Sequence, residues 1–172
     1  MDIWYRQDEG QTHFRVIYSE DNAVYLGNGV VGQPARWVGA PPDEGVSVAQ
    51  VTAALARRAQ GEGFEKIAHD ELHLLLVQHA EEDLARRHAI EQALHNALVG
   101  HGLGYVDEGD IGMGKMTIWI HVTDPALAAP HCVQTLRDLQ QLEGALIVTQ
   151  APGQEAFQPL WPANWSGEFS VR

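Results

Sequence analysis

The stretch that decides the fold reads LHLLLV and occupies residues 72–77. A nearly continuous apolar run of this length is typical of a central β-strand that is buried on both faces. A helical pattern follows over residues 81–99, and Gly100 and Gly102 are expected to end it. The apolar stripe of that helix consists of Ile90, Leu94, Ala97 and Leu98, with Leu84 at its margin.

The same pattern continues to residue 149. Tyr105 and Val106 open a second predicted strand, and residues 107–114 are expected to form a Gly-rich acidic connection. Apolar runs at 116–122 and 145–149 predict two more strands. Between them, Asp124 followed by Pro125 is a helix-start signal, although Pro130 leaves open whether the regular helix begins there instead. Val133, Leu136 and Leu139 are expected on its core side. The resulting β-α-β-β-α-β order predicts a ferredoxin-like plait.

The first third reads as short strands separated by Asp, Asn and Gly turns. Aromatic and β-branched residues predict strands at 4–6, 13–18, 23–26 and 37–38. Gly27, Gly29 and Gly32 are expected to interrupt the third strand. Ser47 is the expected N-cap of a helix over residues 48–59, which should stop near Gly61 or Gly63.

Residues 22–67 resemble the WGR domain, a small β-rich module named for a Trp-Gly-Arg signature. The resemblance rests on a meander that leads into NGVVG at 28–32, on the Ala-rich helix, and on Gly63-Phe64, where the family usually has a Gly-Tyr pair. Asn28 and Val30 replace the signature Trp and Arg. The resemblance implies nucleic-acid contact through that Arg, so its replacement argues against this role here.

The domain boundaries follow from these patterns. We expect a WGR-like β-rich domain at 1–68, a ferredoxin-like domain at 69–149, and a Trp- and Pro-rich tail at 150–172. Trp161 and Trp165 should pack the tail onto the body, because large aromatic rings are rarely left in water. The second half also has a general likeness to bacterial plait domains, including some small immunity-type proteins.

Composition narrows the classes of function. Across 172 residues there is no apolar run long enough to span a membrane. We expect a cytoplasmic protein without a secretory leader, because the first residues lack a basic segment followed by an apolar run. The single Cys132 excludes an internal disulfide. Acidic residues outnumber basic ones 23 to 11. This balance disfavours nucleic acid and anionic membranes, and it favours either a basic protein partner or simple solubility.

Catalytic and metal-binding motifs are weak. The acidic stretch at 107–114 lacks the EF-hand pattern, and Cys132 beside His131 lacks a nucleophile signature. A metal-dependent enzyme would use His121 with His79 or His73 on the neighbouring strand, together with the acids at 107–110 or Asp124. We expect no cofactor and no resident metal, because the sequence has no H-E-x-x-H motif and no Cys pair.

The leading hypothesis is therefore a non-enzymatic protein-interaction module, of an accessory or immunity type, whose partner is not identified and could be basic; a homodimer is plausible. Its candidate partner-binding residues are Trp4, Trp37, Trp161, Trp165, Asp107, Glu108 and Asp110. The alternative is a nucleic-acid-associated regulator that binds through Arg57 and Arg58. It requires one basic patch built from Arg6, Arg15, Arg36, Arg57 and Arg58.

Overall fold

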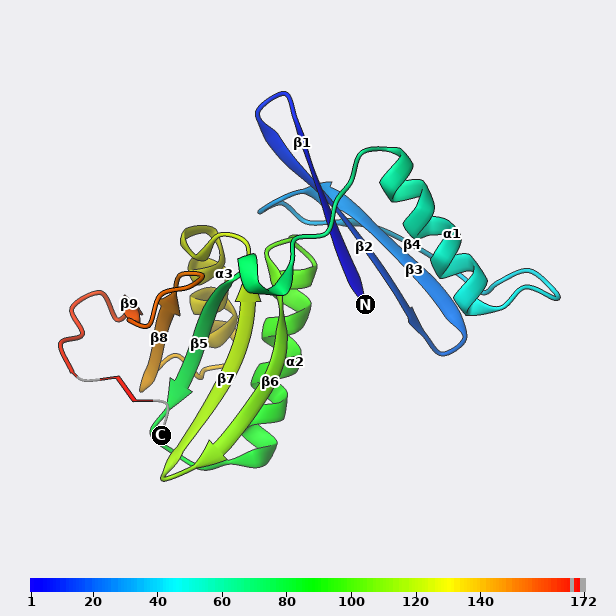
Figure 1. The fold of residues 1–172 in the computed structure, drawn as a ribbon. Coiled ribbons are helices and arrows are strands. Elements are labelled where there is room, and N and C mark those ends of the chain that lie inside the picture. Colours follow the sequence, from blue (N-terminus) through cyan, green and yellow to red (C-terminus); the bar gives the residue numbers. More distant parts are fainter. Residues whose placement is uncertain (168, 171–172) are drawn as a thin grey trace. The chain divides into compact units, whose positions relative to one another are not determined.

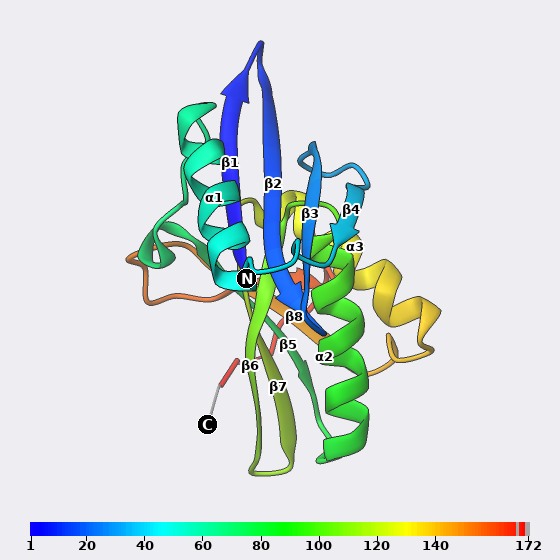
Figure 2. The same ribbon diagram turned by 90° about the vertical axis from the view of Figure 1, so that its right-hand side faces the viewer.

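In the computed structural model, which describes residues 1–167, 169 and 170, the chain is an α+β protein. It divides into two compact units (Figures 1 and 2). The first comprises residues 1–67 together with 100–102, and the second comprises 68–99 and the chain from 103 onward. Each unit has its own antiparallel sheet and its own helices, so each is described by itself.

The first unit is a four-stranded meander with one helix. Its strands are β1 (Asp2–Asp8), β2 (Gln11–Glu20), β3 (Ala23–Val30) and β4 (Arg36–Ala40), and they lie in that order in the sheet. The β2–β3 turn is made by Asp21 and Asn22, both at positive φ, as a two-residue hairpin requires. The predicted meander is therefore confirmed.

Strand β3 corrects one prediction, because it runs through Gly27 and Gly29 instead of stopping there. A Cβ on Gly27 would lie 2.7 Å from the Trp37 ring, and one on Gly29 would lie 2.7 Å from the Phe14 ring. Because these glycines have no side chain, aromatic rings from neighbouring strands can pack directly over their backbone. This packing replaces the side-chain contacts that glycine cannot make.

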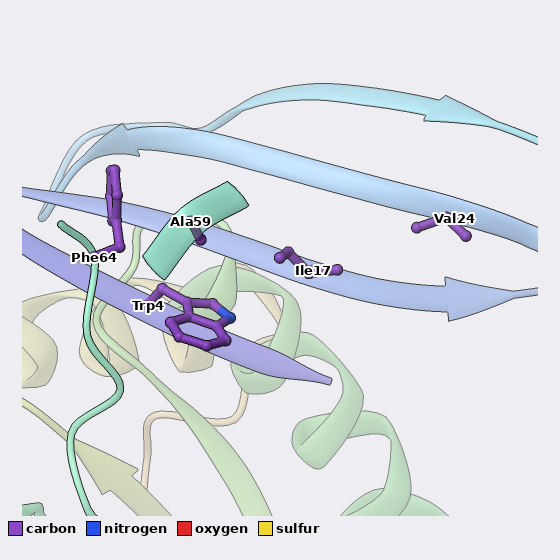
Figure 3. Close-up of a cluster of buried hydrophobic side chains, with 5 residues drawn as sticks. All are labelled: Trp4, Ile17, Val24, Ala59 and Phe64. Carbon is purple, nitrogen blue, oxygen red and sulfur yellow. The ribbon is translucent and has the colours of Figure 1, made fainter. Parts of the chain in front are cut away.

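Helix α1 (Val48–Gly61) covers part of one face of this sheet. Ser47 caps it as predicted, and Ser47 and Gln50 form a reciprocal capping box. A buried cluster joins the sheet to the helix and to the segment after it (Figure 3). The cluster consists of Trp4, Ile17, Val24, Ala59 and Phe64, against which Val48, Val51, Leu55 and Ala56 of α1 pack.

The second unit is a five-stranded antiparallel sheet with two helices. Its strands, in sheet order, are β6 (Gly104–Gly112), β7 (Lys115–Val122), β5 (His73–His79), β8 (Ala145–Gln150) and β9 (Gln158–Trp161). Helices α2 (Leu84–Val99) and α3 (Pro125–Asp138) both lie on one face of this sheet (Figures 1 and 2). A one-turn 3₁₀ helix, η1 (His69–Glu71), precedes β5.

The core of the second unit lies between the sheet and α2 and α3. Leu75 and Val77 of β5 pair with Ile120 and Ile118 of β7, and all four are fully buried. From α2 the stripe Ile90, Leu94 and Leu98 is fully buried as predicted, whereas Leu84 is exposed. In α3 the core positions are Ala128, Cys132 and Leu136, while Leu139 is exposed beyond the last turn. The both-face burial predicted for β5 is confirmed.

Two boundaries differ from the prediction. Residues 107–112 belong to β6, so the acidic stretch is a strand and not a connection, and the hairpin turn is Met113 and Gly114 at positive φ. Helix α2 begins at Leu84, because Asp83 accepts the Arg86 N–H and so acts as its cap. Helix α3 does begin at Pro125 after Asp124, as the capping signal predicts.

The tail contains a strand that the sequence did not predict. Strand β9 pairs with β8 and extends the sheet. Further along, the carbonyl oxygen of Ser170 accepts hydrogen bonds from Gln78 and Lys115. Gln78 alternates with Val77, so this contact lies on the sheet face that α2 and α3 leave open. Within the described part of the chain, no helix combines the length and apolar content needed to cross a membrane.

Candidate functional site

A basic groove lies on the helix-bearing face of the first sheet, beyond the cluster that α1 covers. Cross-strand pairing places Arg6 beside His13, and Arg15 beside Asn28, which in turn pairs with Arg36. These five side chains line a groove of about 510 Å³, together with Glu62 and Phe64. We call these seven residues the arginine groove. Three arginines from three different strands therefore face one cavity.

Phe64 and Glu62 hold two of these arginines in place. The guanidinium carbon of Arg15 lies 4.5 Å from the Phe64 ring centroid, and that of Arg6 lies 5.0 Å from it. Arg15 also donates to Asn28 Oδ1 at 2.8 Å and to Glu62 Oε2 at 2.7 Å. Arg6 donates to the Glu62 carbonyl oxygen at 3.0 Å. The guanidinium planes are thus oriented before any ligand arrives.

Glu62 is shared between the groove and α1. Its other carboxylate oxygen accepts from Arg58 Nε at 2.7 Å. Hydrogen bonds from Arg58 and then Arg15 hold the pKa of the Glu62 carboxyl below its usual value. The groove therefore contains three arginines and one carboxylate, so its local charge is positive although the chain carries a net charge of −12. Planar guanidinium groups of this kind bind carboxylate and phosphate in a bidentate way.

The edge strand β4 borders this groove. All five of its residues are exposed, and Val38 is 60% exposed. Trp37 is 40% exposed on the opposite face from Arg36, and its ring lies 5.8 Å from that of Tyr18. Tyr18 stacks on Tyr25 at 4.8 Å. An exposed strand edge with an aromatic cluster on one face and a basic groove on the other can pair with an extended peptide.

The structure brings together most of the five predicted basic residues. Arg6, Arg15 and Arg36 line the arginine groove. Arg58 lies beside it, since it lines a second cavity of about 370 Å³ with Arg15 and Asn28. Arg57 is exposed on α1 and lines neither cavity. The nucleic-acid hypothesis requires one patch of five arginines, and four of the five lie together.

The predicted tryptophans have different surroundings. Trp4 is 4% exposed and belongs to the core of the first unit, where the Lys66 ammonium lies 4.9 Å from its ring centroid. Trp37 is exposed on β4, and Trp161 and Trp165 are half-buried in the tail. Of these four rings, Trp37 is the one most available to a partner.

The predicted acidic residues lie on edge strand β6. Glu108 and Asp110 are exposed. Asp107 lies at a bulge, where the β6–β7 register shifts between Val106 and Glu108. Its carboxylate Oδ2 is 3.5 Å from His121 Nε2. Burial, and then the nearby His69, hold the pKa of the His121 imidazole below its usual value.

The histidines of the metal hypothesis do not all share a face. His79 pairs with Met116 and lies on the side covered by α2 and α3, whereas His121 pairs with Tyr105 on the other side. These two side chains therefore do not form one site. Instead His69, from η1, lies against His121, with ring centroids 3.9 Å apart. The sequence analysis missed His69, because it precedes the strands of the plait.

Comparisons with known proteins identify no relative. No family model, no curated protein and no solved structure matches this chain.

Proposed function

We propose that this protein is a non-enzymatic binding protein, and that its arginine groove and the β4 edge take up an extended acidic segment of a partner protein. The observation that supports it is the arrangement of Arg6, Arg15 and Arg36 beside an exposed edge strand. Two of these arginines are already oriented by Glu62 and Phe64.

The geometry of a strand favours such a ligand. Residues two apart along an extended chain project to the same face at about 6.7 Å. If a peptide pairs with β4, its acidic residues at alternate positions lie on the side of Arg36 and the groove. Its intervening side chains then lie on the side of Trp37. Main-chain hydrogen bonds would supply affinity, and the guanidinium–carboxylate pairs would supply selectivity.

Nucleic acid is the second candidate, and the clustering of four arginines is the observation that favours it. Phosphate oxygens suit guanidinium groups as well as carboxylates do. A nucleic acid, however, carries many charges, and a chain of net charge −12 repels it at long range. A short acidic segment meets less of that repulsion, so we prefer the peptide.

Two finer assignments of fold accompany this proposal. We propose that the first unit is WGR-like, which is supported by the meander, the following helix and the position of Asn28 and Val30 in the groove lining. We propose that the second unit is ferredoxin-like with an added strand. Its β5-α2-β6-β7-α3-β8 succession and the strand order β6-β7-β5-β8 support this assignment. Binding of a basic partner by Glu108 and Asp110 stays a prediction.

Fluorescence anisotropy tests the proposed function. The probes are a labelled peptide of alternating Glu and Val, its Lys-for-Glu counterpart, and a labelled single-stranded DNA. Arg36→Ala removes an exposed guanidinium from the groove, and Arg57→Ala is the matched control on α1. We expect the acidic peptide to bind, and Arg36→Ala to weaken it about ten-fold, which is the effect of about 1.4 kcal/mol.

Three outcomes distinguish the candidates. Loss of peptide binding in Arg36→Ala but not in Arg57→Ala supports the proposal. Binding of DNA in preference to the peptide, with a steep loss of affinity as salt is raised, selects the second candidate. If neither acidic probe binds at low salt, or if the Lys peptide binds instead, the groove is not the site of recognition.

A further inference from the structure

Three potential metal ligands converge in the second unit. His69 comes from η1, Asp107 from β6 and His121 from β7. One ligand atom from each lies within 4.8 Å of the other two. His121 Nε2 and Asp107 Oδ2 lie 3.5 Å apart.

The sheet explains why these residues meet. Tyr105 on β6 pairs with His121 on β7, so their side chains share a face. The bulge that follows leaves Asp107 outside the regular register and so lets its carboxylate turn toward His121. The chain enters β5 through η1, and this places His69 over the same end of the sheet, where its Nδ1 lies 3.1 Å from the Tyr105 hydroxyl.

We propose that His69, Asp107 and His121 form a binding site for a first-row divalent cation, with Zn²⁺ as the best match. Two imidazoles and one carboxylate are the ligand types that zinc takes in open sites, where a fourth position is left for water or a ligand. Bonds of about 2.0–2.1 Å in a tetrahedral site separate the ligand atoms by about 3.4 Å.

The observed separations between ligand atoms fit that geometry if His69 moves slightly toward the other two residues. The His121–Asp107 separation of 3.5 Å already matches it. The remaining separations, up to 4.8 Å, shorten if His69 moves, and His69 is exposed on a single helical turn. Tyr105, whose hydroxyl contacts His69, is the side chain placed to orient that imidazole as an outer partner.

A structural explanation without a metal is less complete. His69 stacking on His121, and the His121–Asp107 pair, could simply close this end of the sheet. That explanation does not account for the third potential ligand atom, from His69, which lies within 4.8 Å of those of His121 and Asp107. Two imidazole rings and a carboxylate together form a set of electron-pair donors suited to a cation.

Isothermal titration of metal-stripped protein with Zn²⁺ tests the site directly, and Co²⁺ titration followed by its visible d–d absorption reports the coordination geometry. The variants are His69→Ala and Asp107→Asn, both at exposed positions. The matched controls are His88→Ala, exposed on α2, and Asp110→Asn, exposed on the same strand as Asp107. Circular dichroism verifies that each variant is folded.

We expect one Zn²⁺ per chain in the wild type and in both controls. His69→Ala and Asp107→Asn should each weaken Zn²⁺ binding roughly ten-fold or more, since even changes to outer partners of a metal cost that much. Absence of a one-to-one complex, or equal Zn²⁺ affinity in all five proteins, overturns the site. Because the cluster belongs to the second unit and the arginine groove to the first, failure of either proposal leaves the other intact.

Discussion

Acid should destabilise this protein partly through one buried imidazole. His79 is 2% exposed on the helix-covered side of β5, and its Nδ1 lies 3.2 Å from Arg86 Nη2. Burial, and then the Arg86 charge, lower the pKa of His79 from its usual 6.5 to about 4. The imidazole is therefore neutral in the folded protein at neutral pH, with Nδ1 accepting the hydrogen bond from Arg86.

The sign of the effect follows from proton uptake. Between pH 6.5 and pH 4 the unfolded chain binds a proton at His79 that the folded protein does not bind. Above pH 6.5, His79 therefore does not lower the free energy of unfolding. As the pH falls from 6.5 toward 4, proton uptake by the unfolded chain lowers that free energy progressively. At about 1.36 kcal/mol per pKa unit, the loss from this group is about 3 kcal/mol below pH 4 and about 2 kcal/mol at pH 5.

Urea unfolding followed by circular dichroism at pH 8, 6.5 and 5 measures this loss, with EDTA present so that metal does not contribute. His79→Gln is the comparison, because its amide stays neutral and its oxygen can accept from Arg86. Between pH 8 and pH 5 the wild type should lose about 2 kcal/mol more than the variant. The pKa values of His95 and His121 are also lowered, but these groups are common to both proteins and cancel. An equal loss in the two proteins refutes the reasoning.

Three substitutions and one labelling experiment test the packing and the first helix. Gly27→Ala places a Cβ 2.7 Å from the Trp37 ring, so it should cost about 1 kcal/mol in urea unfolding, and an unchanged midpoint contradicts the ring packing. At Gly61, in α1, an added Cβ has no atom within 4 Å, and alanine has a higher helix propensity than glycine. Gly61→Ala should therefore raise the free energy of unfolding by about 0.5 kcal/mol in the same assay. Ser47→Ala removes the capping box and should cost about 1 kcal/mol, which a thermal melt resolves; no change would mean that the cap is dispensable. Burial raises the pKa of the Cys132 thiol to about 12, so a thiol reagent at pH 8 should label it in urea but not in the native protein; rapid native labelling contradicts its burial.

Local sequence patterns predicted the start of a helix correctly where a single capping residue determines it. Ser47 and Asp124 mark helix starts by hydrogen-bonding to backbone N–H groups a few residues on, and both predictions are confirmed. The patterns failed where a glycine is accommodated by a distant residue. Gly27 continues β3 because Trp37 lies over it, and Gly109 continues β6 at a point where a Cβ would meet the Glu91 side chain of α2. Such contacts depend on tertiary structure, which composition and spacing do not encode.

The candidate metal site failed to emerge from the sequence for a related reason. His79 and His121 lie on adjacent strands, as predicted, but pairing registers place them on opposite faces of the sheet. A shift of one residue in register exchanges the faces of a strand, and the sequence does not fix that register. His69 stands before the first strand, and the bulge at Asp107 is invisible in the residue pattern.

The charges that bear on a ligand of the first unit act over two different ranges. The chain-wide charge of −12 opposes a polyanion at distances where salt screens the interaction, since the Debye length is about 10 Å at 0.1 M. The guanidinium groups of Arg6, Arg15 and Arg36 act at contact distance within one groove, where screening is weaker. If an acidic peptide binds in the groove, the nearby arginines attract it and the distant acidic groups of the chain repel it. Added salt screens the long-range repulsion more than the short-range attraction. The affinity of the peptide should therefore fall less steeply with salt than that of a nucleic acid, which releases counterions on binding.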